Sequence, residues 1–319
     1  MRVLSGMQPS GEAHLGNYFG SIKPNVELQG QDENIFMVAD LHALTSVQDP
    51  DALRRYRQSL TMDLLACGFN PGKSILFFQS YVPEHAELAW ILSCVTPVGL
   101  LERAVSYKEK VGKGMAASAG LFAYPVLQAA DIVLYDANIV PVGKDQKQHV
   151  EMARDIAGKF NHRYGKDILV VPDVQIREEV AVVPGTDGQK MSKSYGNTIP
   201  VFADEKVIEK AIMGIVTDSK TVGEAKNPEK CVVFQLHALF LDDAGKRSLA
   251  EKYRAGGLGY GEAKKMLFRA CMEHFRSMRE KRSGLQEACV EGVIKDGAVR
   301  AEAIAGKTME RVRKAVGLR

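Results

Sequence analysis

The chain has 319 residues, of which 45% are hydrophobic and 25% are charged, and its formal net charge is +3 at neutral pH. This composition is ordinary for a globular protein of one large or two medium domains, so it excludes the disordered and fibrous classes. No apolar run approaches the ~20 residues of a membrane span, and the N-terminus lacks the apolar segment of a signal peptide. We expect a cytoplasmic protein with no membrane partner, whose pI near 8.5 is compatible with a nucleic-acid partner.

The five cysteines predict neither a disulfide framework nor a metal site. They show no Cys-x-x-Cys spacing and no nearby histidine pattern, and they stand at Cys67, Cys94, Cys231, Cys271 and Cys289. We expect them to be buried small hydrophobic residues in a reducing compartment.

The first 200 residues alternate short apolar segments with amphipathic ones. Strands are expected over 2–6, 34–39, 74–79, 138–142 and 168–171, and helices over stretches such as 51–67 and 86–96. This alternation predicts an α/β fold with a parallel sheet, whose ligands would bind where the strands end.

From about residue 203 the pattern is helical throughout, so we place a domain boundary between 195 and 203. The glycines over 256–259 predict a helix end, and Ser283 and Gly284 predict another. Between these ends one apolar stripe recurs at helical spacing, at Ala263, Met266, Leu267, Ala270, Cys271, Phe275 and Met278. The basic residues of this part either meet nucleic-acid phosphates or form solvated faces: Lys281, Arg282, Arg300, Lys307, Arg311, Arg313 and Lys314.

A turn suited to phosphate follows the first strand. It runs from Gln8 through Pro9, Ser10 and Gly11 into the sequence 14–17, which opens a helix. Unpaired backbone amides and the helix dipole favour an anion at such a place. The alternative is an ordinary tight turn with a serine or histidine helix cap.

A second such segment is the loop 190–194, Lys-Met-Ser-Lys-Ser. Lys190 and Lys193 supply positive charge for phosphates, and glycines before the loop allow it to move. Alone, the segment could equally be a solvated charged loop. A third segment, 140–149, passes from a strand through Gly143 into a helix that Asp145 could cap.

Together and in this order, the first two segments resemble those of the class I aminoacyl-tRNA synthetases. With 5–11, 145–149 and 190–194 considered jointly, the chain resembles the bacterial tryptophanyl-tRNA synthetases. This resemblance implies that L-tryptophan and ATP form tryptophanyl-adenylate, from which tryptophan passes to tRNA(Trp). It also implies a Rossmann-like, doubly wound catalytic domain over 1–200, a helical anticodon-binding domain over 201–319, and a homodimer formed through an insertion at about 80–125.

The resemblance further implies an ATP site that needs no nucleophilic side chain, because the substrate carboxylate attacks the α-phosphate. The catalytic cations would be Lys110, Lys190 and Lys193, and Mg²⁺ would be held by phosphates and water. The residues implied to bind ATP are Gln8, Pro9, Ser10, His14, Gly16, Asn17, Gly143, Lys144, Asp145, Val182, Lys190, Met191, Ser192, Lys193 and Ser194.

The expected tryptophan pocket centres on the segment 123–132. Pro125 suits a first helical turn, which places Tyr124, Gln128 and Asp131 on one helix face. A buried acid there needs a partner, and the resemblance implies that this is the indole N–H of the substrate. A basic neighbour in the protein is the alternative. The residues implied to bind tryptophan are Leu4, Gln8, His42, Tyr124, Gln128, Asp131 and Gln146.

Three other functions remain open from the sequence. Tyrosyl-tRNA synthetases share the two nucleotide motifs and often have a glutamine three residues before the pocket acid, as Gln128 precedes Asp131 here. Against them, Leu4 would pack an indole ring but would leave a phenol half satisfied. The second alternative is a nucleotidyltransferase of the same fold that acts without tRNA. The third is a non-catalytic nucleic-acid or regulatory binder of this fold, against which the retained Lys190 and Lys193 count.

Overall fold

The computed structural model describes residues 1–319 except 31–32, 105–111, 113–117, 143–146 and 177–182. Within the described residues, five strands form one parallel sheet in the order β3-β2-β1-β4-β5. The strands are β1 (Arg2–Met7), β2 (Glu33–Val38), β3 (Ser74–Phe78), β4 (Ile139–Val142) and β5 (Asp173–Ile176). The strand order reverses between β1 and β4, so the predicted Rossmann-like, doubly wound sheet is confirmed.

The helices of the first half alternate with these strands. They are α1 (Leu15–Asn17), α2 (Lys23–Glu27), α3 (Asp40–Ala43), α4 (Pro50–Ala66), α5 (Glu84–Ser93), α6 (Val98–Glu102), α8 (Ala119–Leu134) and α9 (Lys147–Tyr164). Those of the second half follow one another: α10 (Glu205–Met213), α11 (Val232–Ala238), α12 (Asp243–Ala255), α13 (Tyr260–Ser283) and α14 (Glu287–Val316). None of the helices in the described ranges is long and apolar enough to cross a membrane.

The fifth strand differs from its prediction: it spans Asp173–Ile176 instead of 168–171. The apolar run at 168–171 packs beside α9, because the Asn161 side chain bonds both the backbone N–H (2.9 Å) and the carbonyl (2.8 Å) of Leu169. Those two backbone groups are therefore satisfied locally, and pairing with β4 begins only after Pro172. The hydrophobic pattern predicted a strand close to this point in the chain, but not the residues that pair with β4.

The sheet is buried on both faces. On β2, Ile35 and Met37 belong to one apolar cluster and Phe36 and Val38 to another. The first cluster includes residues of α5, α8, α9 and α14, whereas the second includes residues of α1, α4 and α13. A parallel sheet covered on both faces produces continuous apolar runs without alternation, as in this strand.

The predicted apolar stripe lies on α13, where Ala263, Leu267, Cys271 and Phe275 are buried. The predicted helix ends are also confirmed, because α12 stops before Gly256 and α13 stops at Ser283.

The five cysteines are free thiols, and three of them, Cys67, Cys231 and Cys271, are buried as expected. Cys94 and Cys289 are exposed, which corrects the expectation for those two.

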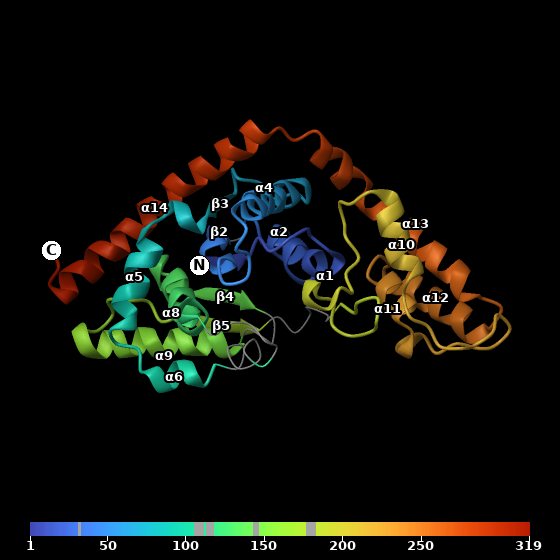
Figure 1. Ribbon diagram of the computed structural model, residues 1–319, viewed down its shortest axis with the longest axis horizontal. Coiled ribbons are helices and arrows are strands. Elements are labelled where there is room, and N and C mark those ends of the chain that lie inside the picture. The colour runs from blue at the N-terminus through green and yellow to red at the C-terminus, as the bar shows by residue number, and fades with distance from the viewer. Residues whose placement is uncertain (31–32, 105–111, 113–117, 143–146, 177–182) are drawn as a thin grey trace.

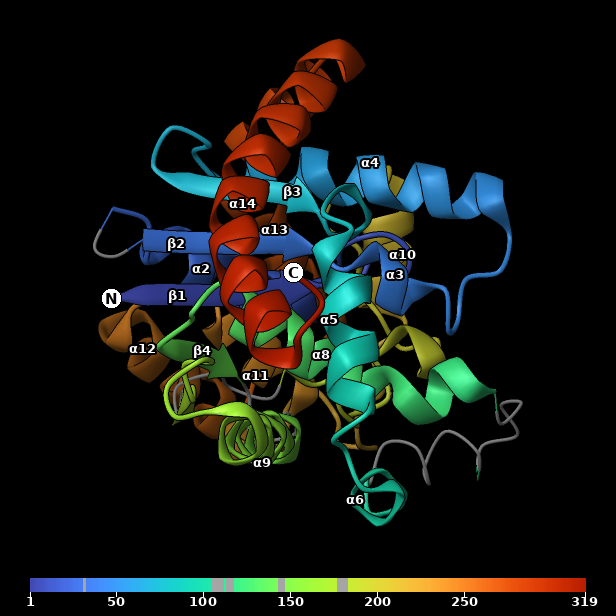
Figure 2. The ribbon, with the colours of Figure 1, turned by 90° about the vertical axis from the view of Figure 1, so that its left-hand side faces the viewer.

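Helix α14 returns to the sheet instead of remaining with the other late helices. Ala298, Ala301, Ala305 and Met309 share a buried cluster with Leu4 of β1. Figure 1 shows α14 leading from the α10–α13 group to a C-terminus beside α5, and Figure 2 shows it crossing in front of the strands. The segment 201–319, predicted as a second domain, thus contributes its last helix to the cover of the sheet.

Several basic residues expected to face nucleic acid bond to partners within the first 200 residues. Arg282 bonds Asp63 and Ser59, Arg300 donates to the carbonyl of Pro71, Arg311 bonds Asp136, and Arg313 bonds Glu87. These contacts hold α13 and α14 to the rest of the fold, which weighs against a role for these arginines in binding tRNA.

Gly297 of α14 lies against β3, and adding one methyl group at this position tests that contact. A Cβ on Gly297 would lie 1.8 Å from the carbonyl oxygen of Leu76, whereas one on Gly306 of the same helix meets nothing within 4 Å. We expect Gly297→Ala to lower the free energy of unfolding by about 2–3 kcal/mol through overpacking. Gly306→Ala should raise it by up to ~1 kcal/mol, because alanine favours helix. Urea unfolding measures both, and equal midpoints for the two variants would contradict this packing.

Candidate active site

The first phosphate-type turn lies where β1 ends. Gln8 and Ser10 are exposed, Pro9 between them is buried, and the Ser10 N–H donates to the Gln8 carbonyl at 3.0 Å. Gly11 has a φ of +125°, which side-chain-bearing residues rarely adopt. The turn thus carries polar side chains at the carboxyl edge of the sheet.

His14 and Asn17 cap the helix α1 that follows. The His14 Nδ1 accepts from the Asn17 N–H at 3.3 Å, and the Asn17 Oδ1 accepts from the His14 N–H at 3.3 Å. This reciprocal pair is a capping box, which satisfies two of the unpaired amides at the helix start. The capping alternative considered for His14 is therefore correct in this structure, and it fixes both side chains beside the turn.

The Lys-Met-Ser-Lys-Ser loop lies directly against this turn. The Gly16 N–H donates to the Sδ of Met191 at 3.3 Å across 175 residues of sequence. Backbone bonds of 3.0 Å from Leu15 to Ile199 and from Val201 to Ala13 continue the contact. The structure therefore brings together the two segments that the sequence predicts to share a nucleotide.

Asn197, which is 2% exposed, stabilises the loop through hydrogen bonds of its side chain. Its Oδ1 accepts from the Ser192 N–H at 2.8 Å, and its Nδ2 donates to Asp187 Oδ1 at 2.8 Å and to the Lys190 carbonyl at 3.1 Å. A Cβ on Gly185 would lie 2.2 Å from the same Nδ2, so only glycine fits there. Neither Asp187 nor Asn197 was among the predicted site residues, because their contacts close a loop that hydropathy does not show.

Burial governs the charges where the motifs meet. It lowers the pKa of Lys193 to about 8, although the carboxylates of Asp63 and Glu12 oppose that shift. It also lowers the pKa of His14 to about 4, and the nearby charge of Lys193 lowers it further. At neutral pH Lys193 is thus a cation beside an uncharged histidine. Lys190 and Ser194 are exposed, and Ser192 is half-buried.

The segment expected to bind the amino acid forms α8, with one correction. The helix starts at Ala119, where the Ser118 side chain accepts from the Leu121 N–H at 3.1 Å, so Pro125 lies inside the helix and not in its first turn. Proline lacks the N–H that an interior position normally donates to the carbonyl four residues earlier. Gln128 is half-buried on this helix, and Asp131 is 2% exposed.

Asp131 is bonded by three protein side chains. Its Oδ1 accepts from Gln79 Nε2 at 2.7 Å and lies 2.6 Å from His85 Nδ1, and its Oδ2 lies 2.7 Å from His42 Nε2. Burial by itself would raise the pKa of Asp131, but its charge interactions and hydrogen bonds with the two histidines outweigh burial and hold the pKa at about 2. The buried acid therefore has basic neighbours in the protein, one of the two alternatives open from the sequence.

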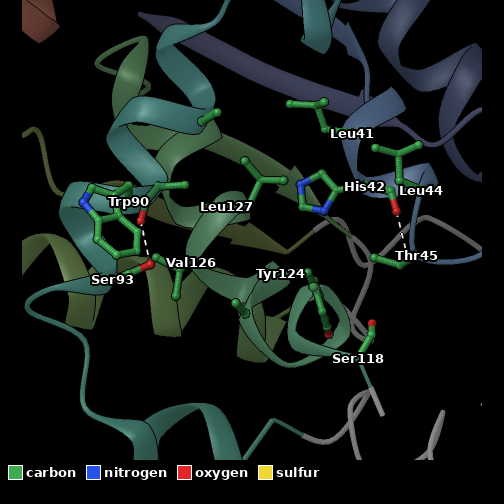
Figure 3. A pocket seen from close by; sticks show the side chains of 14 residues that line it. Leu41, His42, Leu44, Thr45, Trp90, Ser93, Ser118, Tyr124, Val126 and Leu127 are labelled. Atoms are coloured by element: carbon green, nitrogen blue, oxygen red, sulfur yellow. Dashed lines mark hydrogen bonds between the residues drawn. The ribbon is translucent and has the colours of Figure 1, made fainter. Parts of the chain in front are cut away.

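An apolar cavity of about 460 Å³ lies between α3, α5 and α8. Figure 3 shows His42 and Tyr124 among its lining side chains, together with Leu127 and Trp90. Tyr124 also bonds His149, its hydroxyl lying 2.5 Å from the Nε2 of that histidine. Of the predicted tryptophan-binding residues that the structure describes, only His42 and Tyr124 line this cavity.

Two other predicted tryptophan-binding residues lie on or directly after β1. Leu4 is buried on β1, and Gln8 is exposed at the end of that strand. Six predicted catalytic, ATP-binding or tryptophan-binding residues lie outside the residues that the structure describes: Lys110, Gly143, Lys144, Asp145, Gln146 and Val182.

Sequence reasoning did not find Gln79, His85 or Tyr135 as partners of the Asp131 cluster. Tyr135 follows Asp131 at helical spacing, which is a weak signal, and His85 begins a helix that otherwise reads as core. Gln79 follows the third strand as Gln8 follows the first, so a polar residue at a strand end was the available signal.

Comparison with known proteins identifies the family. A model of the tRNA synthetases class I (W and Y) matches residues 1–276. The chain belongs to the class I tRNA synthetases. This membership confirms the family predicted from the two motifs, and the roles of single residues remain predictions.

Relatives within the class I tRNA synthetases match over the whole chain. A tryptophan–tRNA ligase of Rhodopirellula baltica is 50% identical, and the alignment covers 100% of both chains. A tryptophan–tRNA ligase of Fusobacterium nucleatum is 48% identical over 99% of this chain and 98% of its own. The crystal structure of tryptophanyl-tRNA synthetase from Campylobacter jejuni complexed with ADP and tryptophan has 48% identity and a TM-score of 0.93, covering 100% of both chains.

The contacts of Asn197 predict how the synthetase loop responds to protease. We expect Asn197→Ala to speed tryptic cleavage after Lys190 or Lys193, because the loop loses three hydrogen bonds at once. Gln189→Ala, a change to an exposed side chain in the same loop, is the matched control. Mass spectrometry of timed digests measures both rates, and equal rates would show that Asn197 does not hold the loop.

Proposed function

We propose that the chain is a tryptophan–tRNA ligase, which forms tryptophanyl-adenylate and then transfers tryptophan to tRNA(Trp). The observation that carries this proposal is the buried Asp131, which two histidines and Gln79 keep ionised on α8. A carboxylate only accepts hydrogen bonds, and the indole N–H only donates them. The full-length relatives at 48–50% identity, named as tryptophan–tRNA ligases, support the same substrate.

The nucleotide would bind where the two motifs meet. ADP in the Campylobacter jejuni structure supports ATP as a substrate here. We place the triphosphate between the turn after β1 and the loop at 190–194, with Lys193 beside Gly11 as a positioned cation. The tryptophan carboxylate attacks the α-phosphate and pyrophosphate leaves, so the chain supplies position and charge instead of a nucleophile.

Mg²⁺ would accompany ATP, coordinated by phosphate oxygens and water. Among the described residues no group of three or more histidine, cysteine, aspartate or glutamate side chains could hold a metal ion. The donor atoms for a divalent cation would then come mainly from the nucleotide.

Tyrosine is disfavoured by the chemistry of β1. Leu4 is 3% exposed and offers no polar atom to a phenol, whose oxygen both donates and accepts hydrogen bonds. The site would therefore leave a tyrosine hydroxyl partly unsatisfied, at a cost of about 1–3 kcal/mol.

Transfer to tRNA requires a basic surface, and one groove meets that need. Arg103, Arg154, Lys159, His162 and Arg163 line a groove of about 1030 Å³ between α6 and α9. We assign tRNA phosphates to this groove and anticodon contacts to the helices α10–α13.

ATP–pyrophosphate exchange tests the proposed reaction, with tryptophan, tyrosine and phenylalanine supplied separately. Exchange with tryptophan alone, followed by charging of tRNA(Trp), is the expected result. Exchange with tyrosine would assign the chain to the tyrosyl branch, and exchange without tRNA charging would support the tRNA-independent alternative.

Replacement of Lys193 should slow adenylate formation while leaving tryptophan binding intact. We expect Lys193→Ala to lower the exchange rate by at least ~100-fold, as for loss of one preorganised charge-stabilising donor. Because the pKa of Lys193 is about 8, kcat/KM for ATP should fall as pH rises above ~8, where the free enzyme loses this cation.

Two variants control for the Lys193 result. Lys206→Ala removes an exposed lysine from α10 and should leave the rate unchanged. Lys193→Arg, which stays charged, should lose the decline above pH 8. An unaltered rate in Lys193→Ala would remove this lysine from the mechanism.

The apolar cavity supports the proposed homodimer. Trp90 is 72% exposed and Leu44 53% exposed, and both line this cavity, so they belong to one contiguous apolar surface that a partner could cover. We expect Trp90→Glu to convert a dimer to a monomer in sedimentation velocity. Val207→Glu, at a residue of 51% exposure on α10, should leave the dimer intact. A dimer that survives Trp90→Glu would place the interface elsewhere.

A further inference from the structure

His85 is fully buried on α5 and bonds one residue of α8 and the residue that caps its C-terminal end. Its Nδ1 lies 2.6 Å from Asp131 Oδ1, and its Nε2 lies 2.7 Å from the hydroxyl of Tyr135. The ring stacks on Phe77 of β3 with 6.0 Å between centroids and 26° between planes. None of these contacts involves the nucleotide motifs, so the proposed reaction leaves this histidine without a role.

The hydrogen-bond partners of His85 determine where its proton lies. Burial raises the pKa of Tyr135 well above 10, and the charge of Asp131 raises it further, so the phenol keeps its proton. That hydroxyl can donate to Nε2, which leaves the ring proton on Nδ1, directed at Asp131. Tyr135 thus sets the tautomer in which His85 donates to the carboxylate.

Gln79 is oriented in a similar way. Its Oε1 accepts from the backbone N–H groups of Leu41 at 3.1 Å and His42 at 3.4 Å, so its Nε2 is the atom left to donate to Asp131 Oδ1. Oδ1 therefore accepts from both Gln79 and His85.

The two oxygens of Asp131 are consequently unequal. A carboxylate has about four acceptor positions, two on each oxygen. Among the described residues, Gln79 and His85 fill those of Oδ1, whereas His42 fills one of Oδ2. Within the described part of the chain one acceptor position remains, on Oδ2, whose partner His42 also lines the cavity.

We propose that His85 and Tyr135 are specificity-determining positioning residues, which occupy Oδ1 so that Oδ2 of Asp131 receives the indole N–H of tryptophan. This inference rests on the proposed function. Without the donated Nδ1–H, the carboxylate would lose a partner in a buried site and could rotate or take up a proton. A protonated acid would no longer offer the indole a pure acceptor, so recognition of the N–H would weaken.

The test compares two substrates in each variant. L-Tryptophan donates the indole N–H, whereas benzothienyl-alanine has sulfur in its place and donates nothing. ATP–pyrophosphate exchange gives kcat/KM for each. We expect Tyr135→Phe and His85→Leu to lower kcat/KM for tryptophan by ~10-fold, the effect of one buried hydrogen bond. The value for the sulfur analogue should change by less than about twofold, since it never used that bond.

A matched control separates positioning from packing. Phe77→Leu disturbs the stacking partner of His85 without touching a hydrogen bond, so it should lower both values by the same factor. Equal losses for the two substrates in Tyr135→Phe would overturn the inference, since only a packing role would then remain. Tyr135→Phe removes a single oxygen, so it keeps the test valid if His85→Leu fails to fold.

The wild-type protein and Asp131→Asn distinguish this inference from the function it rests on. No preference of the wild type for tryptophan over the sulfur analogue would remove the role of Asp131 in the proposed function. A wild-type preference that is lost in Asp131→Asn but kept in Tyr135→Phe and His85→Leu would overturn only the positioning role.

Discussion

The arrangement of the elements proposed to bind tryptophan depends on one buried carboxylate. Asp131 stands on α8, and its partners come from α3, from the turn after β3 and from α5. Three protein donors offset much of the cost of burying this charge, so the positions of these four elements are mutually constrained. Removal of one donor would leave the buried carboxylate with fewer partners, which costs more than loss of an exposed ion pair.

The two segments proposed to bind the nucleotide are joined by backbone hydrogen bonds instead. The backbone bonds from Leu15 to Ile199 and from Val201 to Ala13 place the second motif against the first. Helix α14 supports this arrangement from the other face, where its small side chains let it lie against the sheet beneath β1 and β3.

The sequence was sufficient for the elements with strong local signals. The first four strands, the stripe on α13, its glycine end and the two phosphate-type segments were all predictable, because each is encoded by periodicity or by turn residues. The fifth strand was not, since Asn161 satisfies the backbone of the apolar run that looked like a strand. The interior position of Pro125 was missed because the Ser118 cap, which starts the helix earlier, is a weak signal in sequence. His85 and Asn197 acquire their roles from contacts between distant segments, which no local pattern encodes, and Gln79 carried only the signal of a polar residue at a strand end.

The central claim is that Asp131 is an anion with one acceptor position reserved for the substrate. Carbon-13 NMR of protein labelled at the aspartate carboxyl carbon, with Asp131 assigned through Asp131→Asn, measures this directly. With a pKa held at about 2, the Asp131 signal should stay constant from about pH 5 to 8. It should then shift when L-tryptophan is added but not when the sulfur analogue is added. A signal that titrates within this range, or that shifts equally with both ligands, would contradict the account.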